Sequence, residues 1–278
     1  MFGYVYSVPV RFKHQELRGH GVRRGQRVGL VTNEYEQLAR QELARWQKKM
    51  TRSPGVIDST TRRLQQRVNA WIPEQLHSAL TTAVRQMVGG VLTRSNLIAT
   101  APLLDAPLDE REARVREKIE RYRRTAAIEG GVTGAGGVLL GLADFPLLLG
   151  IKLNLLVEIA ALYGHACSDV RERVYLLHIL QLAFSSDAHR AQVYQHLLAW
   201  PASVGDGARA LDDLDWRLLQ QEYRDYLDLA KLAQLMPVIG APVGVFVNNR
   251  LLRKLGDTAM NAHRLRWFAS PAASSQAR

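Results

Sequence analysis

Apolar positions dominate the chain between residues 126 and 164, where two long apolar runs are separated by a short polar break at residues 144–146. The first run is rich in glycine. The second run contains three conspicuous polar side chains: Lys152, Asn154 and Glu158. A helix that is apolar on all sides must be buried in a protein core or in lipid. We therefore predict a tight helical hairpin here, buried in one of those two settings.

Elsewhere the apolar residues recur at helical spacing, and no convincing series of alternating strands occurs. Helices are predicted from Asn33 onward, after Pro73, from Asp109 to Arg124, from Asp187 to Trp200, and over residues 213–235 and 249–268. The fold class that follows is all-α, a multi-helix bundle with a central glycine-rich apolar helical hairpin. The charge-dense segment at residues 109–124 is expected to be a solvated helix with ion pairs four residues apart.

Three short motifs mark helix ends in the middle of the chain. Tyr163 and Gly164 form a good C-terminal stop for the second arm of the hairpin. Asp169, followed by Glu172, resembles a capping box that opens the next helix. Asp144 is well placed to cap the N-terminus of the second arm.

Glycines recur four residues apart in two apolar segments, which places each pair on one helix face. The six residues concerned are Gly130, Gly134, Gly137, Gly141, Gly240 and Gly244. A glycine inside a helix costs about 1 kcal/mol relative to alanine, so a compensating close contact is expected. Two interpretations remain open: tight packing of glycine-rich helices inside a bundle, or insertion of the hairpin into a membrane.

The chain divides into three parts: a basic, weakly structured extension at residues 1–32, a helical domain at residues 33–268, and a disordered tail at residues 269–278. The net charge of +11 is concentrated at the N-terminal end, because residues 1–63 contain 13 Lys/Arg and 5 Asp/Glu. This excess suggests attraction to an anionic surface such as lipid headgroups or nucleic acid. A solvated tail without a partner is the alternative. No nucleic-acid-binding motif is recognisable, so we expect no specific nucleic-acid partner.

We expect a cytoplasmic protein that can associate peripherally with the inner membrane. No secretory signal is visible, and no window offers a clean apolar span of about 20 residues. Cys167 is the single cysteine, which fits a reducing compartment and a structural role. Shallow or re-entrant insertion of the hairpin stays open.

The candidate binding residues are the polar groups of the hairpin and its exit: Asp144, Lys152, Asn154, Glu158 and His165. A carboxylate in such an apolar helix should have a partner or a raised pKa, so Glu158 could serve a ligand or pair with a neighbouring arginine. Metal-ligand spacings, a phosphate-binding loop and a nucleophile elbow are all missing from the sequence. We therefore expect no metal site and no cofactor, and an enzyme is the less favoured interpretation.

Two segments resemble the signature regions of the EcsC family. One is GGVTGAGGVLLGLADFPLLLGIKLNLLVEIAALYG, and the other is PVIGAPVG followed by Asn248-Asn249 and by Ala259-Met260-Asn261-Ala262-His263-Arg264-Leu265-Arg266. The resemblance covers roughly residues 33–268. It implies a helical bacterial protein with an accessory role linked to an ABC transporter or to protein secretion. It supplies no catalytic residues.

Three functions are compatible with these patterns. The leading one is a non-enzymatic, peripheral membrane-associated protein, whose partner is a membrane surface or a membrane protein. The second is a soluble helical module that binds a lipid, another small amphiphile or a partner helix. The third is a hydrolase that uses Asp144 and Glu158 as an acid/base pair.

Overall fold

A computed structural model describes residues 24–52, 101–133, 145–185, 189–203 and 240–270. This part of the chain contains six helices and no strand, which confirms the all-α fold class. The helices are α1 (Arg24–Met50), α4 (Leu108–Thr133), α6 (Phe145–Leu162), α7 (Val170–Phe184), α8 (Arg190–Ser203) and α11 (Gly240–Ala269).

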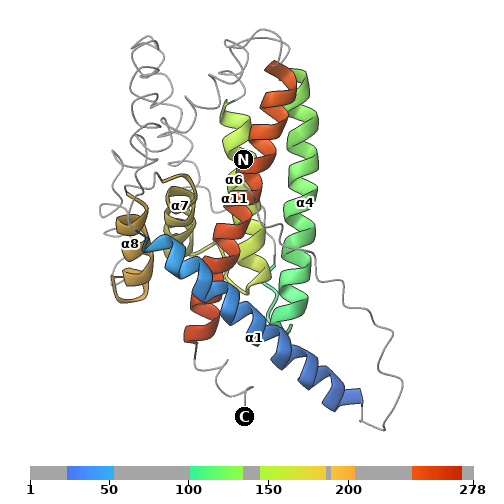
Figure 1. Ribbon diagram of the computed structural model, residues 1–278, viewed down its shortest axis with the longest axis vertical. Helices are drawn as coiled ribbons and strands as arrows, with labels where there is room; N and C mark the ends of the chain where they lie inside the picture. Colours follow the sequence, from blue (N-terminus) through green and yellow to red (C-terminus); the bar gives the residue numbers. More distant parts are fainter. Residues whose placement is uncertain (1–23, 53–100, 134–144, 186–188, 204–239, 271–278) are drawn as a thin grey trace.

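Three helices, α4, α6 and α11, form the centre of the bundle (Figure 1). Helix α11 packs most extensively on α4 and also contacts α6 and α7. Helix α7 packs on α8 on one flank, and α1 crosses the lower end of the bundle in the view of Figure 1, where it contacts α4, α8 and α11. Residues far apart in sequence are thus brought together at the end of the bundle where α1 lies.

Helix α6 lies inside the protein core. Leu149, Leu155 and Val157 are almost completely buried, on different sides of the helix. This burial explains why α6 is apolar on nearly all sides, as expected for a helix with protein around it. The segment between α4 and α6 lies outside the described residues, together with Asp144, Gly134, Gly137 and Gly141, so the hairpin turn stays a prediction.

The glycine that allows close helix packing in the described core is Gly256, which the sequence analysis did not single out. A Cβ atom at this position of α11 would lie 2.5 Å from Cδ1 of Ile119 on α4. Any larger residue would therefore push the two helices apart. Of the predicted packing glycines, Gly130 lies near the end of α4, and Gly240 and Gly244 lie in the first turns of α11.

Helix α6 ends as predicted at Tyr163-Gly164. Gly164 has φ +91°, a left-handed conformation that glycine adopts without a Cβ clash. Its N–H donates to Ala161 O at 3.0 Å, and the N–H of His165 donates to Ala160 O at 2.9 Å. These two bonds form a Schellman motif, which satisfies carbonyls at the helix end and directs His165 out of the helix.

Helix α7 begins at its predicted cap, because the Asp169 side chain accepts a hydrogen bond of 2.9 Å from the N–H of Arg171. Glu172 does not complete the capping box. Its carboxylate accepts two hydrogen bonds of 2.7 Å from Arg266 of α11. Tertiary pairing with a guanidinium has replaced the local bond, and it joins α7 to α11.

Two helices begin earlier than the sequence pattern predicted. Helix α11 starts at Gly240 and not near Asn249, and Pro242 falls in its first turn, where the missing N–H has no helical acceptor. Helix α1 starts at Arg24 and not at Asn33. Within the described residues, no helix is both long and apolar enough to cross a membrane.

Candidate functional site

Glu158 has the ion-pair partners that the sequence analysis gave as its structural alternative. Lys118 Nζ lies 2.7 Å from Oε2, Arg121 Nη2 lies 3.5 Å from the same atom, and Tyr122 donates its hydroxyl to Oε1 at 2.8 Å. All three partners are on α4. The carboxylate therefore links α6 to α4, and both of its oxygens are engaged.

The other two polar candidates of α6, Lys152 and Asn154, differ in how far they are buried. Lys152 is 3% exposed, and burial lowers the pKa of its ammonium to about 8. Asn154 is partly exposed. Among the described residues, neither side chain lines the pocket described below, so these two candidate binding residues do not contribute to it.

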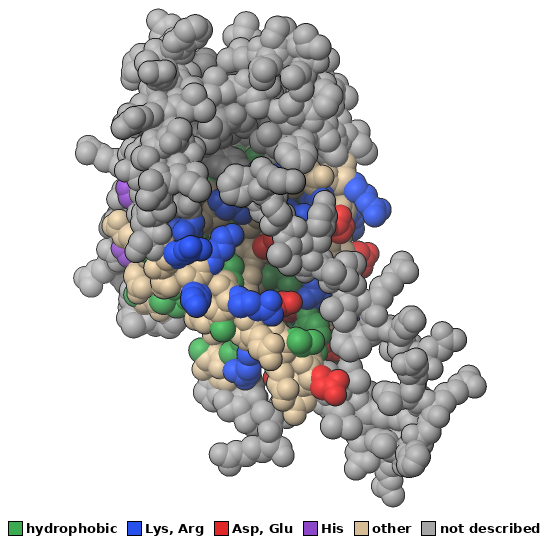
Figure 2. Space-filling view, viewed as in Figure 1, with side chains coloured by type: hydrophobic (Ala, Val, Ile, Leu, Met, Phe, Trp, Pro, Cys, Tyr) green, Lys and Arg blue, Asp and Glu red, His purple; other side chains and the backbone are tan. Residues whose placement is uncertain are grey.

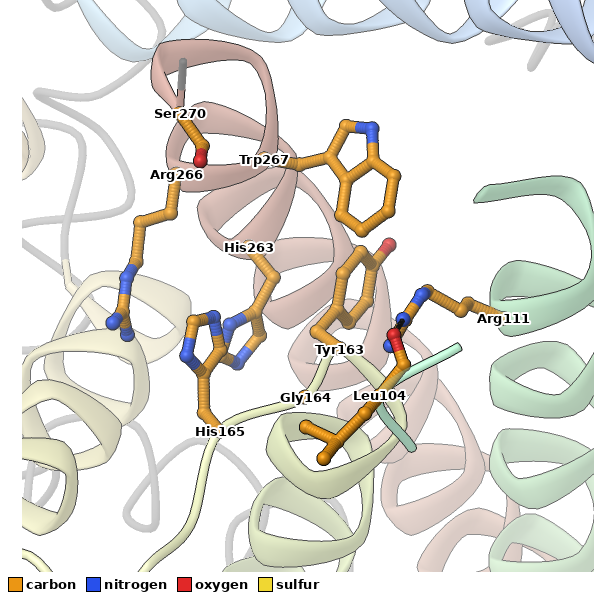
Figure 3. Close-up of a pocket in the computed structure, with 9 residues that line it drawn as sticks. All are labelled: Leu104, Arg111, Tyr163, Gly164, His165, His263, Arg266, Trp267 and Ser270. Carbon is orange, nitrogen blue, oxygen red and sulfur yellow. Dashed lines mark hydrogen bonds between the residues drawn. The ribbon is translucent and has the colours of Figure 1, made fainter. Parts of the chain in front are cut away.

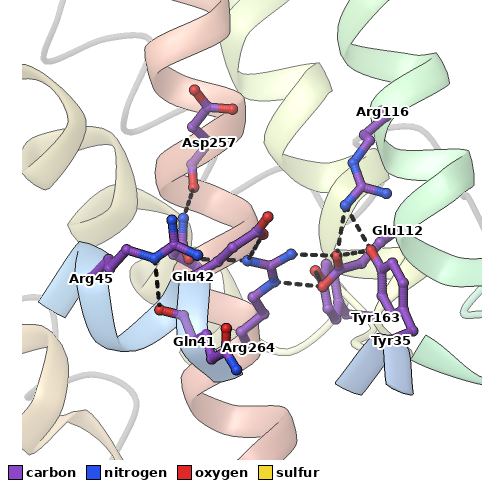
Figure 4. A network of polar contacts seen from close by, with 10 residues as sticks. Tyr35, Gln41, Glu42, Arg45, Glu112, Arg116, Tyr163, Asp257 and Arg264 are labelled. Atoms are coloured by element: carbon purple, nitrogen blue, oxygen red, sulfur yellow. Dashed lines mark hydrogen bonds and ion pairs between the residues drawn. The ribbon is translucent and has the colours of Figure 1, made fainter. Parts of the chain in front are cut away.

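A buried carboxylate, Glu112 of α4, is the centre of a polar network (Figure 4). Arg264 of α11 donates to it from Nε at 2.7 Å and from Nη2 at 2.6 Å. The hydroxyls of Tyr35 and Tyr163 donate at 2.5 Å and 2.9 Å. Burial alone would raise the pKa of Glu112, but the hydrogen bonds and charge of Arg264 outweigh it, so the pKa lies below its ordinary value. The network joins α1, the end of α6 and α11 to α4.

A pocket of about 250 Å³ lies beside this network, where α6 ends near the last turns of α11 (Figure 3). Its described lining residues are Leu104, Arg111, Tyr163, Gly164, His165, His263, Arg266, Trp267 and Ser270. No aspartate or glutamate is among them. A space of this size is far larger than one water molecule needs, and it approaches the range of small-ligand sites.

Three rings are stacked along one wall of the pocket. The ring of His263 lies between those of Tyr163 and His165, at centroid distances of 5.0 Å and 5.3 Å. His263 is completely buried, and neither of its ring nitrogens has a hydrogen-bond partner. Burial lowers the pKa of His165 to about 4 and holds the pKa of His263 well below 6.5. Both imidazoles are therefore neutral at pH 7.

Arg111 lies on the far side of the Tyr163 ring from the two histidines in Figure 3 and is 3% exposed. Its guanidinium donates to the carbonyl oxygens of Leu103, Leu104, Ala106 and Leu162. These four bonds leave one of the five N–H groups on the guanidinium. Carbonyl groups solvate the cation but do not neutralise it. The carboxylates of Asp105 and Glu110 attract Arg111 without lining the pocket, so part of its positive charge is left for the pocket.

Arg266 contributes a second cation at the side of the two histidines (Figure 3). It is paired with Glu172 through two parallel hydrogen bonds, and it lies 4.8 Å from the centroid of the Tyr175 ring. This fork-to-fork geometry fixes the guanidinium plane beside the pocket. The pocket is thus enclosed by rings, one compensated cation and one partly compensated cation.

Of the candidate residues from the sequence, His165 alone lines this pocket among the described residues. Asp144 lies outside the described part, and Glu158 belongs to the α4–α6 ion pair. The sequence analysis did not assign roles to Arg111 and His263. His263, Arg264 and Arg266 do fall within the C-terminal signature segment at residues 259–266. Arg111 and Glu112 lie in the segment at residues 109–124, which was predicted to be a solvated helix, so neither was expected to be buried.

Comparison with known proteins agrees with the resemblance seen in the sequence. A model of the EcsC protein family matches residues 37–268. Protein EcsC of Bacillus subtilis (strain 168) is 39% identical over 231 residues, which cover 83% of this chain and 95% of that protein. Uncharacterized protein YdbA of the same strain is 31% identical over 153 residues, which cover 55% of this chain and 56% of that protein. No solved structure matches the chain.

Proposed function

The chain belongs to the EcsC family, and from its charge distribution we propose that it is a non-enzymatic, peripheral protein of an anionic membrane surface. In this function it is accessory to a membrane partner such as an ABC transporter or a secretion system. The single observation that carries the proposal is the basic excess of residues 1–63. The family match begins at residue 37, so residues 1–36 contribute +3 of this excess from outside the match, and residues 37–63 contribute the other +5.

Helix α1 and the residue pair after it present part of this charge to solvent. Between residues 33 and 52 the exposed basic residues are Arg40, Arg45, Lys48, Lys49 and Arg52. The exposed acidic residues of the same stretch are Glu34 and Glu42. Figure 2 shows Lys and Arg side chains gathered on the face that α1 crosses. A basic face of this kind supports electrostatic binding to anionic headgroups.

Burial of α6 in the protein core favours electrostatic attraction over insertion of that helix. Its apolar surface is already covered by α4, α7 and α11. Electrostatic attachment should weaken with salt, because the Debye length falls to a few ångströms at high ionic strength.

The test is flotation of the full-length protein with vesicles of phosphatidylcholine alone or mixed with phosphatidylglycerol. Each basic residue near an anionic surface contributes about 1 kcal/mol. Replacing Lys48, Lys49 and Arg52 by glutamine should therefore weaken binding by about 3 kcal/mol, roughly a hundredfold.

A matched control carries the same charge change elsewhere. Arg114 and Arg124 on α4 and Arg253 on α11 are exposed, and their replacement by glutamine should affect binding much less. Equal losses in the two triple variants would show that net charge matters and the α1 face does not. If neither the whole chain nor the chain without residues 1–32 binds anionic vesicles, the proposed membrane function is wrong.

A second candidate function is a ligand-binding module, and the pocket at the end of α6 favours it. The pocket combines unpartnered ring nitrogens with a partly compensated cation, which are features that a polar ligand can satisfy. The hydrolase alternative has less support, because Glu158 is held by Lys118, Arg121 and Tyr122. Native mass spectrometry of the purified protein tests the module: a co-purified small molecule supports it, and a pocket variant should lose that molecule.

A further inference from the structure

We propose that the pocket between the end of α6 and the end of α11 binds a small oxyanion of the phosphate class, attached to an apolar group. The proposal depends on the ligand-binding function given above as the second candidate, and it specifies the ligand. It does not depend on the membrane-surface function.

The positive charge of the pocket selects an anion. Arg111 brings a buried guanidinium whose four described hydrogen bonds go to carbonyl oxygens, and the described lining contains no carboxylate. Arg266 is already compensated by Glu172, so the surplus charge comes from Arg111. A ligand with one negative charge or more would neutralise this surplus in a partly water-excluded site, where the interaction is stronger than in bulk water.

Hydrogen-bonding groups converge on the pocket from several directions, and this favours a tetrahedral oxyanion. His263 has two ring nitrogens without a partner although it is completely buried, and it lines the cavity. His165 lies beside it, and in Figure 3 the ring of Tyr163 stands between these two histidines and Arg111. Each neutral imidazole has one N–H to donate. Ser270 adds a hydroxyl, so the donors come from both sides of the Tyr163 ring and from the end of α11.

An apolar side chain at the pocket, Leu104, is the reason for proposing that the oxyanion carries an apolar group. Leu104 lines the cavity and is nevertheless 71% exposed. A single exposed leucine is ordinary on a protein surface, but this one borders the cavity and offers an apolar contact to a ligand bound there. An apolar group next to the oxyanion would cover Leu104 while the charged end reached the histidines. The same chemistry occurs in a soluble phosphate monoester and in the headgroup of a phosphatidate.

The test uses the full-length protein and three soluble probes: inorganic phosphate, monomeric dihexanoyl phosphatidic acid, and dihexanoyl phosphatidylcholine. Isothermal titration measures affinity, and imidazole ¹⁵N resonances of His165 and His263 report contact. We expect phosphatidic acid to bind at least tenfold more tightly than inorganic phosphate and to shift both histidine signals. Capping the phosphate with choline should weaken binding at least tenfold.

Two variants separate the pocket from the fold. Replacing His263 by phenylalanine removes both ring nitrogens and keeps a flat ring in the stack, and it should weaken phosphatidic acid binding at least tenfold. Replacing His165 by phenylalanine should do the same from a position that is only partly buried. Replacing the exposed His196 on α8 by glutamine should leave the affinity unchanged.

The affinities of the probes show whether the pocket binds a phosphate alone or a phosphate attached to an apolar group. Binding of inorganic phosphate as tight as that of phosphatidic acid would support the oxyanion site and overturn the apolar part. The proposal as a whole is overturned if neither anion binds at millimolar concentration, or if both phenylalanine variants bind like the unmodified protein. Vesicle flotation of the His263→Phe variant keeps this result separate from the membrane function: unchanged flotation with lost probe binding means two independent sites.

Discussion

Replacement of His263 by phenylalanine is expected to stabilise the protein. The imidazole is completely buried, and its two nitrogens have no hydrogen-bond partner, although both are polar. An unsatisfied buried polar group costs about 1–3 kcal/mol. Phenylalanine removes this cost and preserves the ring contacts with Tyr163 and His165, at the expense of about 1 kcal/mol for its larger ring. The net gain in the free energy of unfolding should be about 0–2 kcal/mol at pH 7.

The gain should increase in acid, and the sign follows from the pKa. Burial holds the pKa of His263 in the folded protein well below the ordinary value of 6.5. Below pH 6.5 the unfolded chain therefore takes up a proton that the folded protein does not, and the stability of the unmodified protein falls as the pH falls. At pH 5 the loss for this residue is at most about 2 kcal/mol, which is 1.36 kcal/mol for each pH unit below 6.5. The variant lacks this loss.

Urea unfolding followed by circular dichroism at pH 7 and at pH 5 measures both effects. The difference in unfolding free energy between the variant and the unmodified protein should grow by up to about 2 kcal/mol between the two pH values. His165 titrates in both proteins and cancels in the comparison. The exposed His196 provides the control, since its replacement by glutamine should give no such difference. A variant that is less stable at both pH values, by the same amount, would refute the role assigned to the buried imidazole.

Three further substitutions test the packing around the site. Gly256→Ala should lower the free energy of unfolding by about 1–2 kcal/mol in urea titrations, because the new Cβ meets Ile119. The double variant with Ile119→Ala should lose less stability than the sum of the two single variants. Full additivity would contradict the contact. Glu112→Gln removes the buried carboxylate of Arg264 and leaves it only the half-exposed Glu42 at 2.9 Å, so urea unfolding should show a loss of about 3–5 kcal/mol, and a loss below about 1 kcal/mol would contradict the network. Gly164→Ala forces a side chain into the left-handed region and should lower stability by about 1–2 kcal/mol in thermal unfolding, whereas an unchanged melting temperature would mean that the α6 end adapts.

The fold class and several helix ends could be predicted from the sequence because they depend on local patterns. Apolar spacing defines a helix, Gly164 supplies a left-handed cap, and Asp169 supplies an N-terminal cap, all within a few residues of the feature they determine. The burial of α6 follows from its apolar faces in the same way. The sequence did not show whether protein or lipid covers these apolar faces. In the described part of the chain, helices α4, α7 and α11 pack against α6.

The pocket could not be predicted because its parts come from distant segments. Arg111 and His263 are separated by most of the chain, and each has an ordinary local context: one in a charge-dense helix, the other in a polar stretch of the last helix. The charge pattern of residues 109–124 suggested a solvated face. Burial of Arg111 and Glu112 depends on carbonyls at the end of α6 and on Arg264 of α11, which no local spacing reveals.

The same limit explains the outcome for the candidate polar residues of α6. A carboxylate in an apolar helix indicates that a partner exists, but the sequence does not say whether the partner is a ligand or a neighbouring helix. Glu158 is held by α4. His165 follows the Schellman motif at the end of α6 and lines the pocket, so its position is determined by a backbone turn and not by the helix.

Salt dependence of vesicle binding tests the membrane-surface function most directly. The measurement is the partition coefficient of the unmodified full-length protein on phosphatidylglycerol-containing vesicles between low and high potassium chloride concentration. The account predicts strong binding at low salt, a decrease of at least tenfold as the charges are screened, and no binding to phosphatidylcholine alone. Binding that is absent at low salt, or equally strong on neutral vesicles and at high salt, would contradict it.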